Sequence, residues 1–529
     1  MEISYRLDQI FWTVVRFIIH WYLALFYGRK GKVVPPIKSQ LLQKSATQLA
    51  KEIREGKLKS TDVVEAYIER IQEVDPYINA TVDRRFQDAL KEAHEADLLI
   101  ASRKYTEEQL MNEKPLLGVP LTVKMVLFVK GLRCTGGSKL FEDLVPTEDA
   151  PTVALMKKAG AIIIATTNTP EFGMNIESAN FVHGRTRNPY NTNRTPGGSS
   201  GGESALIASG GSVLGLGNDL LGSLRIPAHF SGIFAHKPTA GLVPNEGCLP
   251  PERLVGEKFP TPGINKYMFM GPMCRYAEDL VTSMKILSTN KEIRMKLGKE
   301  INFHNLKICY LKEIQSYLVA PVDPEISRAL QEAVFYFEKR YSVKAREVKM
   351  PLLMDATRCI INAFHNSTPD YIDMLTGGKG VDFSLKVDFL KSFFGKSTLS
   401  FPVLAILTFA YFPLFYRKCR NSHYENMLEK WMNEFSSLLD ENTILLMPSF
   451  PFSAPYHSEG LSLCLNVCYT ALFNFLGLPS TNCPIGFNKQ KLPIGIQIVA
   501  CKNNDPLTMA CAEELEKAFG GWKAPGGKC

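Results

Sequence analysis

The chain has 529 residues, a formal net charge of +8, 45% hydrophobic residues and 22% charged residues. These values are typical of a globular protein and exclude a disordered or fibrous chain. Lysine and arginine are spread along the chain instead of gathering beside aromatic residues, which argues against nucleic-acid binding. The 12 cysteines and 9 histidines show no metal-ligand spacing, so we expect free thiols in a reducing compartment, no metal and no cofactor.

An apolar and aromatic run at residues 10–27 is interrupted by Arg16 and His20 and followed by a cationic stretch at residues 29–32. The run just reaches the length that spans a bilayer, although an arginine near its middle costs ~2.5–3.5 kcal/mol on insertion scales. We therefore expect a spanning anchor or an interfacial helix, with a buried core helix as the alternative. Because the cations follow the run, the body is expected in the cytosol, at an endomembrane or lipid droplet.

Residues 1–40 thus form a membrane segment and linker, and two helical patterns follow over residues 46–74. The second pattern places its apolar residues on one face behind the capping candidates Ser60 and Thr61. Short apolar runs then alternate with helices, which indicates an α/β arrangement. The expected strands are 121–123, 162–165 and 492–499, and the expected helices among them are 152–159 and 505–519.

An insertion at residues 383–416 is rich in phenylalanine and flanked by lysines, and it is broken by Pro402 and Pro413. A hydrophobic stretch with cationic edges and interrupting prolines suits partial burial in a membrane surface better than a full span. A core helix is the alternative. We expect no further division of the body, so residues 41–529 form one domain with this insertion as a membrane-facing element.

Two short runs are dense in glycine and serine: residues 197–203 (GGSSGGE) and residues 219–227 (DLLGSLRIP). Glycine lets the backbone approach a reacting group and adopt positive φ without a Cβ penalty. Such loops present serine hydroxyls and bare N–H groups together. A flexible Ser/Gly linker is the alternative, but linkers of that kind are long and low in complexity, whereas this stretch spans a handful of residues.

A serine nucleophile needs a base, and amide hydrolysis also needs an acid because the departing amine must be protonated. Histidine usually serves both needs, but only His229 and His236 adjoin these runs, in an apolar segment. A lysine can replace histidine where burial lowers its pKa enough to populate the neutral amine. Lys124, inside the apolar run 119–129, is the candidate, although a lysine in such a run more often sits at a strand edge with its amine in water.

The motifs in combination resemble the amidase signature family over roughly residues 43–525. The matching segments, in chain order, are 121–124 (LTVK), 197–202 (GGSSGG), 219–227 (D-x-x-G-S-x-R-x-P), 477–479 (GLP) and 492–497 (LPIGIQ). Within the family, the apolar N-terminus and residues 271–280 and 519–522 most resemble the fatty-acid amide hydrolases. The resemblance implies an α/β fold with a large mixed, twisted sheet covered by helices on both faces.

The same resemblance implies that Ser223 is the nucleophile, Ser199 a bridging serine held by a cis peptide bond, and Lys124 the base and acid. The implied activity is that of a membrane-associated serine hydrolase, which cleaves lipophilic, fatty-acid amides through an acyl-enzyme. The implied partners are the amide substrate and membrane lipid, with a homodimer as a further expectation.

The resemblance also implies that Ser200 and an Asp219–Arg225 pair support the loop with Ser223. Backbone N–H groups of this loop would stabilise the oxyanion. These groups belong to Leu220, Leu221, Gly222 and Ser223. The family has glycine or alanine at the position of Leu221. A left-handed backbone there would cost leucine ~1–2 kcal/mol, so reduced activity, a narrowed acyl pocket or loss of activity are all open.

Three other functions remain open at this stage. A non-catalytic binding protein that keeps the fold is motivated by Leu221. A Ser-His-Asp type esterase or lipase would use a G-x-S-x-G nucleophile elbow centred on Ser200. It would need an acid and a histidine, His423 or His457, and it leaves Lys124 and the Ser223 run without a role. A subunit of an amidotransferase complex is compatible with the family, although the apolar N-terminus argues against a soluble assembly partner.

Overall fold

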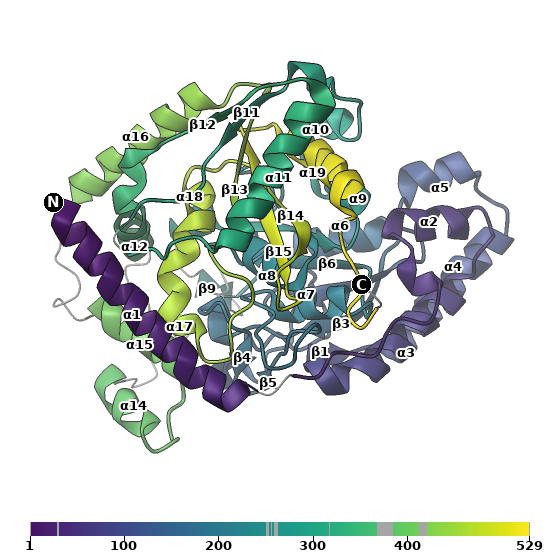
Figure 1. Cartoon of the computed structure of the whole chain (residues 1–529). Coiled ribbons are helices and arrows are strands. Elements are labelled where there is room, and N and C mark those ends of the chain that lie inside the picture. The colour runs from purple at the N-terminus through teal and green to yellow at the C-terminus, as the bar shows by residue number, and fades with distance from the viewer. Residues whose placement is uncertain are drawn as a thin grey trace.

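The computed structural model describes residues 2–28, 31–249, 253–254, 257–258, 263–316, 318–367, 384–411 and 421–527. An 11-stranded sheet runs through the body (Figure 1), with the strand order β1-β3-β2-β6-β10-β7-β14-β15-β13-β11-β12. In that order the strands are Thr81–Arg84, Ile162–Thr167, Pro120–Lys124, Leu214–Asp219, Phe269–Cys274, Phe234–Lys237, Ser480–Phe487, Pro493–Ala500, Thr443–Pro448, Lys307–Tyr310 and Ala345–Glu347. Two small ribbons pair β4 (Ala179–Asn180) with β5 (Gly184–Arg185), and β8 (Arg253–Leu254) with β9 (Glu257–Lys258).

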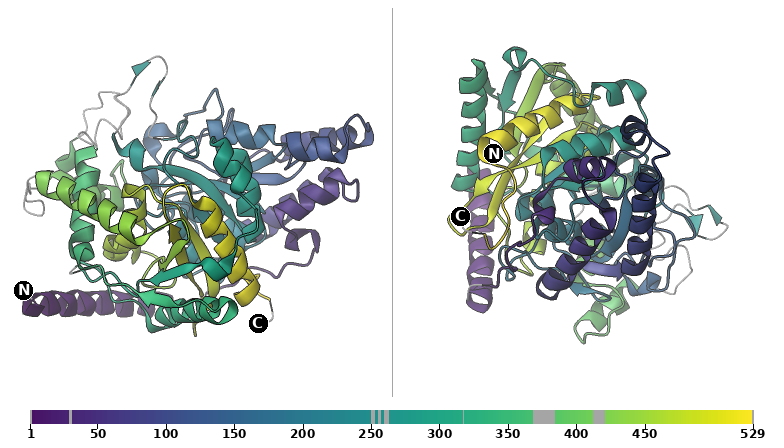
Figure 2. Two further views of the ribbon diagram at one scale, coloured as in Figure 1. Left: turned by 90° about the horizontal axis from the view of Figure 1, so that it is seen from above. Right: turned by 90° about the vertical axis from the view of Figure 1, so that its right-hand side faces the viewer.

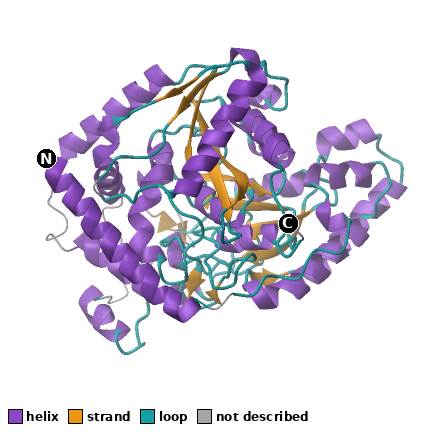
Figure 3. Cartoon of the chain, viewed as in Figure 1, coloured by secondary structure: helices purple, strands orange, loops and turns teal. Residues whose placement is uncertain are grey.

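The sheet is mixed, because β2 runs parallel to β3 and β6 while β10 runs antiparallel to β6 and β7. Helices lie on both sides of it (Figures 2 and 3), which confirms the expected α/β class. The helices are α1 Glu2–Tyr27, α2 Ala46–Arg54, α3 Ser60–Ile78, α4 Phe86–Ala101, α5 Glu107–Glu113, α6 Pro151–Lys158, α7 Gly201–Ala208, α8 Arg225–Ser231, α9 Ala277–Leu287, α10 Lys291–Lys296, α11 Pro324–Tyr341, α12 Ala356–Ser367, α14 Leu385–Ser392, α15 Phe401–Tyr411, α16 Asn421–Leu438, α17 Gly460–Leu463, α18 Cys468–Phe475 and α19 Asp505–Phe519.

The strands and helices expected from periodicity are present, but one cap differs from the expectation. Ser60 and Thr61 lie inside the first turn of α3 and do not cap it. Instead the Asp97 carboxylate accepts their two backbone N–H groups at 2.6 and 3.1 Å. The Ser60 hydroxyl donates to Gly118 O at 2.8 Å, so it ties α3 to the segment that leads into β2.

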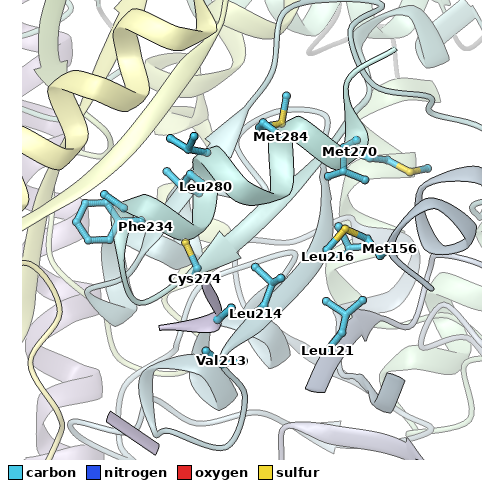
Figure 4. Packing of buried hydrophobic residues seen from close by; sticks show 14 of the residues in the cluster. Leu121, Met156, Val213, Leu214, Leu216, Phe234, Met270, Cys274, Leu280 and Met284 are labelled. Carbon is cyan, nitrogen blue, oxygen red and sulfur yellow. The ribbon is translucent and has the colours of Figure 1, made fainter. Parts of the chain in front are cut away.

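The main core lies between the sheet and the helices on it (Figure 4). Leu280 and Met284 of α9 belong to the same buried cluster as Leu214 and Leu216 of β6, and Leu121 of β2 extends it. These side chains are essentially inaccessible to water. The strands that carry the glycine-rich loops are therefore anchored by packing, which fixes the positions of the loops at their ends.

The N-terminal helix α1 presents an apolar face to solvent, and Arg16 and His20 lie on its less exposed side, which faces the body. Phe17, Trp21 and Leu25, spaced by one helical turn, are 58–68% exposed. On the opposite side His20 Nδ1 lies 2.9 Å from Glu459 Oε1, and the Tyr27 ring stacks on Tyr456. A surface helix of a globular protein has the reverse arrangement. Residues 29 and 30 of the cationic stretch lie outside the described residues.

Within the part of the chain that is described, no helix combines the length and the apolar content needed to cross a membrane.

The insertion contains two helices of different character; residues 383 and 412–416 of the expected range lie outside the described residues. In α15 the apolar residues pack inward in a small cluster of their own with Phe172 and Met174. In α14 and the turn after it, Leu390, Phe393 and Phe394 are 63–77% exposed. The insertion is thus partly core and partly surface.

Candidate active site

The candidate site lies where β2 and β6 end. These two strands are parallel neighbours, so their carboxyl ends lie at the same edge of the sheet. Lys124 is the last residue of β2 and Asp219 the last residue of β6. The loop with Ser199 leads directly into α7, which packs on both strands. The sheet therefore brings together three segments that are far apart in the sequence.

Lys124 and Ser199 are in direct contact. The Lys124 Nζ atom lies 2.6 Å from Ser199 Oγ and 2.7 Å from Asn218 Oδ1. The Lys124 side chain has no exposure to water, so the expected burial is present and the alternative of an amine in water at a strand edge is excluded. Burial lowers the Lys124 pKa to about 7, against the smaller opposing effect of Asp219. A substantial fraction of the amine is therefore neutral near pH 7.

The backbone around Ser199 is fixed by hydroxyl groups from other segments. The Gly198–Ser199 peptide bond is cis. The Ser199 carbonyl accepts from Thr169 Oγ1 at 2.8 Å, and Ser178 Oγ accepts from Gly201 N at 3.0 Å. A Cβ on Gly198 would lie 2.5 Å from Asn175 O, so only glycine allows this close approach.

Ser223 lies on the loop between β6 and α8 and is partly exposed. Its carbonyl accepts from Ser200 N at 3.2 Å, which joins the two glycine-rich loops directly beside Ser199. Among the described residues, no hydrogen bond involves the Ser223 hydroxyl. The structure thus brings Lys124 and Ser199 together, and it links Ser223 to them through the backbone.

The left-handed position in this loop is Gly222, with φ 121°, and not Leu221. A Cβ on Gly222 would lie 2.0 Å from Thr470 Oγ1, so glycine is required there. Thr470 Oγ1 also donates to Leu221 O at 2.7 Å and holds the loop in place. Leu221 therefore carries no left-handed strain, which removes the argument for a binding protein that rests on it.

One of the four expected oxyanion donors is already engaged. The Gly222 N–H donates to Asp219 Oδ1 at 2.7 Å. Among the described residues, the N–H groups of Leu220, Leu221 and Ser223 have no protein acceptor. The available set is therefore three donors and not four.

Asp219 and Arg225 form a fully buried ion pair, as expected from the motif. Arg225 donates from two nitrogens to the two Asp219 oxygens at 3.0 and 3.1 Å, and Asn474 Nδ2 donates to Asp219 Oδ1 at 2.9 Å. Burial alone would raise the Asp219 pKa, but the charge and hydrogen bonds of Arg225 and its other donors lower it to about 2. Removal of one partner of such a pair typically costs ~3–5 kcal/mol. The pair holds both ends of the Ser223 loop.

Three contributors to the site were missed by sequence reasoning: Asn218, Glu203 and Asn474. Glu203 closes the GGSSGGE run, and its buried carboxyl accepts from Thr122 Oγ1 at 2.7 Å and Thr167 Oγ1 at 2.8 Å. Burial raises its pKa to about 8, so the group is mostly protonated at pH 7. It ties the start of α7 to β2 and β3. Two of these three contributors could have been found from the sequence, because Asn218 directly precedes the DLLGSLRIP run and Glu203 is the last residue of the GGSSGGE run.

Among the side chains that the structure describes, no histidine lies beside Ser200, as the nucleophile elbow hypothesis would need. Both ring nitrogens of His457 have other partners: Nδ1 lies 2.9 Å from Glu177 Oε1 and Nε2 lies 3.0 Å from Thr192 O. The side chain of His423 lies outside the described residues. The Ser200 hydroxyl is buried and donates weakly to Asn218 O at 3.5 Å. Within the described part of the chain, Ser200 therefore supports the loop and has no histidine base beside it.

The insertion reaches the site from the side of Ser199. Glu171 Oε2 accepts from Ser400 N, at the start of α15, at 2.6 Å. Gly173 follows Glu171 by two residues, and a Cβ on Gly173 would lie 3.2 Å from Ser199 Oγ. Phe172 and Met174 pack against α15. The backbone of Gly173 thus lies next to the Ser199 hydroxyl, and the residues on either side of Gly173 pack against the insertion.

Comparisons with known proteins agree with this geometry. The sequence matches the family described as Amidase over residues 62–509. It is 40% identical to fatty-acid amide hydrolase 2-A of Danio rerio, over 93% of this chain and 92% of that protein. It is 38% identical to fatty-acid amide hydrolase 2 of Homo sapiens, over 94% of this chain and 93% of that protein. The solved structure of a fatty acid amide hydrolase superposes with a TM-score of 0.72 at 22% identity, covering 91% of this chain and 86% of that chain.

Proposed function

Since this chain belongs to the amidase signature family and is an amide-hydrolysing enzyme, we propose that it cleaves fatty-acid amides by a relay through Lys124, Ser199 and Ser223. The observation that carries the mechanism is the buried Lys124 amine, 2.6 Å from Ser199 Oγ. A neutral amine in an apolar site is a competent base near pH 7. The substrate class is supported by the names of the similar relatives and by the apolar insertion cluster that packs on both neighbours of Gly173, the residue beside Ser199.

In the proposed reaction, neutral Lys124 takes the proton of Ser199, and Ser199 takes the proton of Ser223 as Ser223 Oγ attacks the carbonyl carbon. The N–H groups of Leu220, Leu221 and Ser223 then stabilise the oxyanion, a contribution of ~2.7–4 kcal/mol per donor in related chemistry. The proton returns through Ser199 to the departing amine. Water then attacks the ester at Ser223 with Lys124 again acting as base, and the fatty acid leaves.

A chain-length series tests the substrate class. We expect kcat/KM for primary amides to rise from butyramide towards long-chain amides by about 4-fold per CH2 group that becomes buried, since each buried CH2 contributes ~0.8 kcal/mol. The rise levels off when the acyl site is full. Purified protein is assayed for ammonia release below the critical micelle concentration. Equal kcat/KM for all chain lengths would contradict a lipophilic substrate.

We also propose that α1 lies in a membrane surface and holds the catalytic body on its cytosolic side. The support is the reversed polarity of α1: its exposed face is apolar, while His20 and Arg16 are on the less exposed side. An apolar face of this kind is stabilised in the boundary between lipid head groups and acyl chains. The exposed Phe393 and Phe394, flanked by Lys391 and Lys396, form a second candidate contact of the same chemistry.

Replacing Phe17, Trp21 and Leu25 together with serine is expected to weaken binding to liposomes by at least about 100-fold, because each large apolar side chain contributes ~1.5–3 kcal/mol when fully buried. Co-sedimentation with phospholipid vesicles measures this binding. The control is Leu98→Ser on α4, since Leu98 is 56% exposed and α4 lies at the opposite side of the body from α1 (Figure 1). It should pellet like the unmodified protein. If the triple variant also pellets normally, α1 is not the membrane contact; Phe393→Ser with Phe394→Ser then tests the insertion.

A further inference from the structure

Among the described residues, Lys124 Nζ has two hydrogen-bond partners, and they differ in whether they can donate a proton. Ser199 Oγ, at 2.6 Å, belongs to a hydroxyl and can either donate or accept. Asn218 Oδ1, at 2.7 Å, is an amide oxygen and can only accept. A neutral amine carries two N–H groups and one lone pair, and only the lone pair takes a proton. The orientation of the amine therefore decides whether it acts as a base.

We propose that Asn218 is a positioning residue for Lys124: its amide oxygen takes one N–H of the neutral amine and so turns the lone pair towards the Ser199 hydroxyl. Because Oδ1 cannot donate, the lone pair cannot point at Asn218. Ser199 is then the one of the two partners that can donate a proton to it. This inference rests on the proposed function, since it assigns Lys124 the role of base.

The Asn218 side chain is held in the orientation that this role needs. Its backbone is part of β6 and pairs with Met270 of β10. Its Nδ2 donates towards Met268 Sδ at 3.2 Å, which leaves Oδ1 on the side of Lys124. A flipped amide would place its donors against the lysine N–H groups. Asn218 is 8% exposed, so water does not easily replace it.

An amide also orients the amine without adding a charge. The ionisable groups that act on Lys124 are Asp219 on β6, Glu203 on α7 and Cys248 on the loop after β7, and each favours the protonated amine. Burial outweighs them and keeps the amine partly neutral at pH 7. Glu203 is itself mostly protonated at that pH. A carboxylate at position 218 would add a negative charge in contact with Nζ and oppose this balance.

Two substitutions separate orientation from charge. Asn218→Leu keeps a similar volume and removes the acceptor, so we expect kcat to fall by about 100-fold with little change in KM, as for a misplaced catalytic group. Asn218→Asp keeps an acceptor and adds a charge, so we expect the acid limb of the kcat/KM profile to move up by roughly 1–3 pH units, with activity recovered at high pH. Steady-state kinetics between pH 5 and 10 measure both effects.

The control is Asn482→Asp, the same isosteric change at a fully buried asparagine on β14, where it should lower the melting temperature without moving the acid limb. An Asn218→Asp profile that coincides with the unmodified one overturns the proposal, as does full kcat in Asn218→Leu. Loss of folding in Asn218→Leu leaves Asn218→Asp to decide. If Lys124→Met hydrolyses amides as well as the unmodified protein does, the proposed mechanism itself fails. This failure is distinguishable from a failure of the role proposed for Asn218.

Discussion

Ser223→Ala is expected to lower kcat for amide hydrolysis by roughly 10⁶-fold, the loss seen when the nucleophile of a serine hydrolase is removed. The variant should also lose covalent labelling by a fluorophosphonate, because the probe needs the hydroxyl oxygen of the nucleophile. The fold should be unaffected: Ser223 is partly exposed, and its carbonyl, which accepts from Ser200 N, is kept. Substrate binding should therefore survive and be measurable by equilibrium dialysis.

The control for this experiment is the position of the label. In the unmodified protein and in Ser200→Ala, peptide mass mapping should find the probe on Ser223. A label on Ser200 that disappears in His457→Ala or His423→Ala would instead support the nucleophile elbow. A Ser223→Ala variant that keeps normal turnover would show that the acyl-enzyme forms elsewhere.

Sequence reasoning succeeded where the information is local. The strand that ends at Lys124 and the loops that carry Ser199 and Ser223 were each identified from short runs of residues. The Asp219–Arg225 pair was also within reach, because the two residues are only 6 positions apart and the structure joins them with two hydrogen bonds. Short motifs of this kind specify their own geometry.

Sequence reasoning failed where a contact depends on the tertiary fold. The Asn218 side chain faces Lys124 because β6 and β2 are parallel neighbours, a pairing across 94 residues that periodicity does not reveal. The polarity of α1 is another case, since His20 lies 2.9 Å from Glu459, a residue 439 positions away in the sequence. From the sequence alone, His20 is an interruption of an apolar run. From the structure, His20 is one of the contacts between the helix and the body.

Lys124→Met is expected to lower kcat/KM by about 10²–10⁴-fold at pH 8, the usual contribution of a general base. The pH dependence of kcat/KM is a more specific test of Lys124 as the base than the loss of activity. Burial lowers the Lys124 pKa to about 7, so below pH 7 the amine is protonated and cannot accept the Ser199 proton. Above pH 7 it is neutral and active. In the unmodified protein kcat/KM should therefore rise with pH through about 7, and this limb should be absent in Lys124→Met.

The matched control is Lys237→Met, because Lys237 is also fully buried and burial also lowers its pKa well below the usual value. Its Nζ donates to Pro238 O at 2.8 Å and contacts neither candidate serine. If any buried lysine could produce the limb at pH 7, Lys237→Met would remove it too. If the limb belongs to Lys124, it persists in Lys237→Met, even where that variant is less stable. A limb that survives in Lys124→Met would assign the base to another group and would leave the contact between Lys124 and Ser199 with a structural role only.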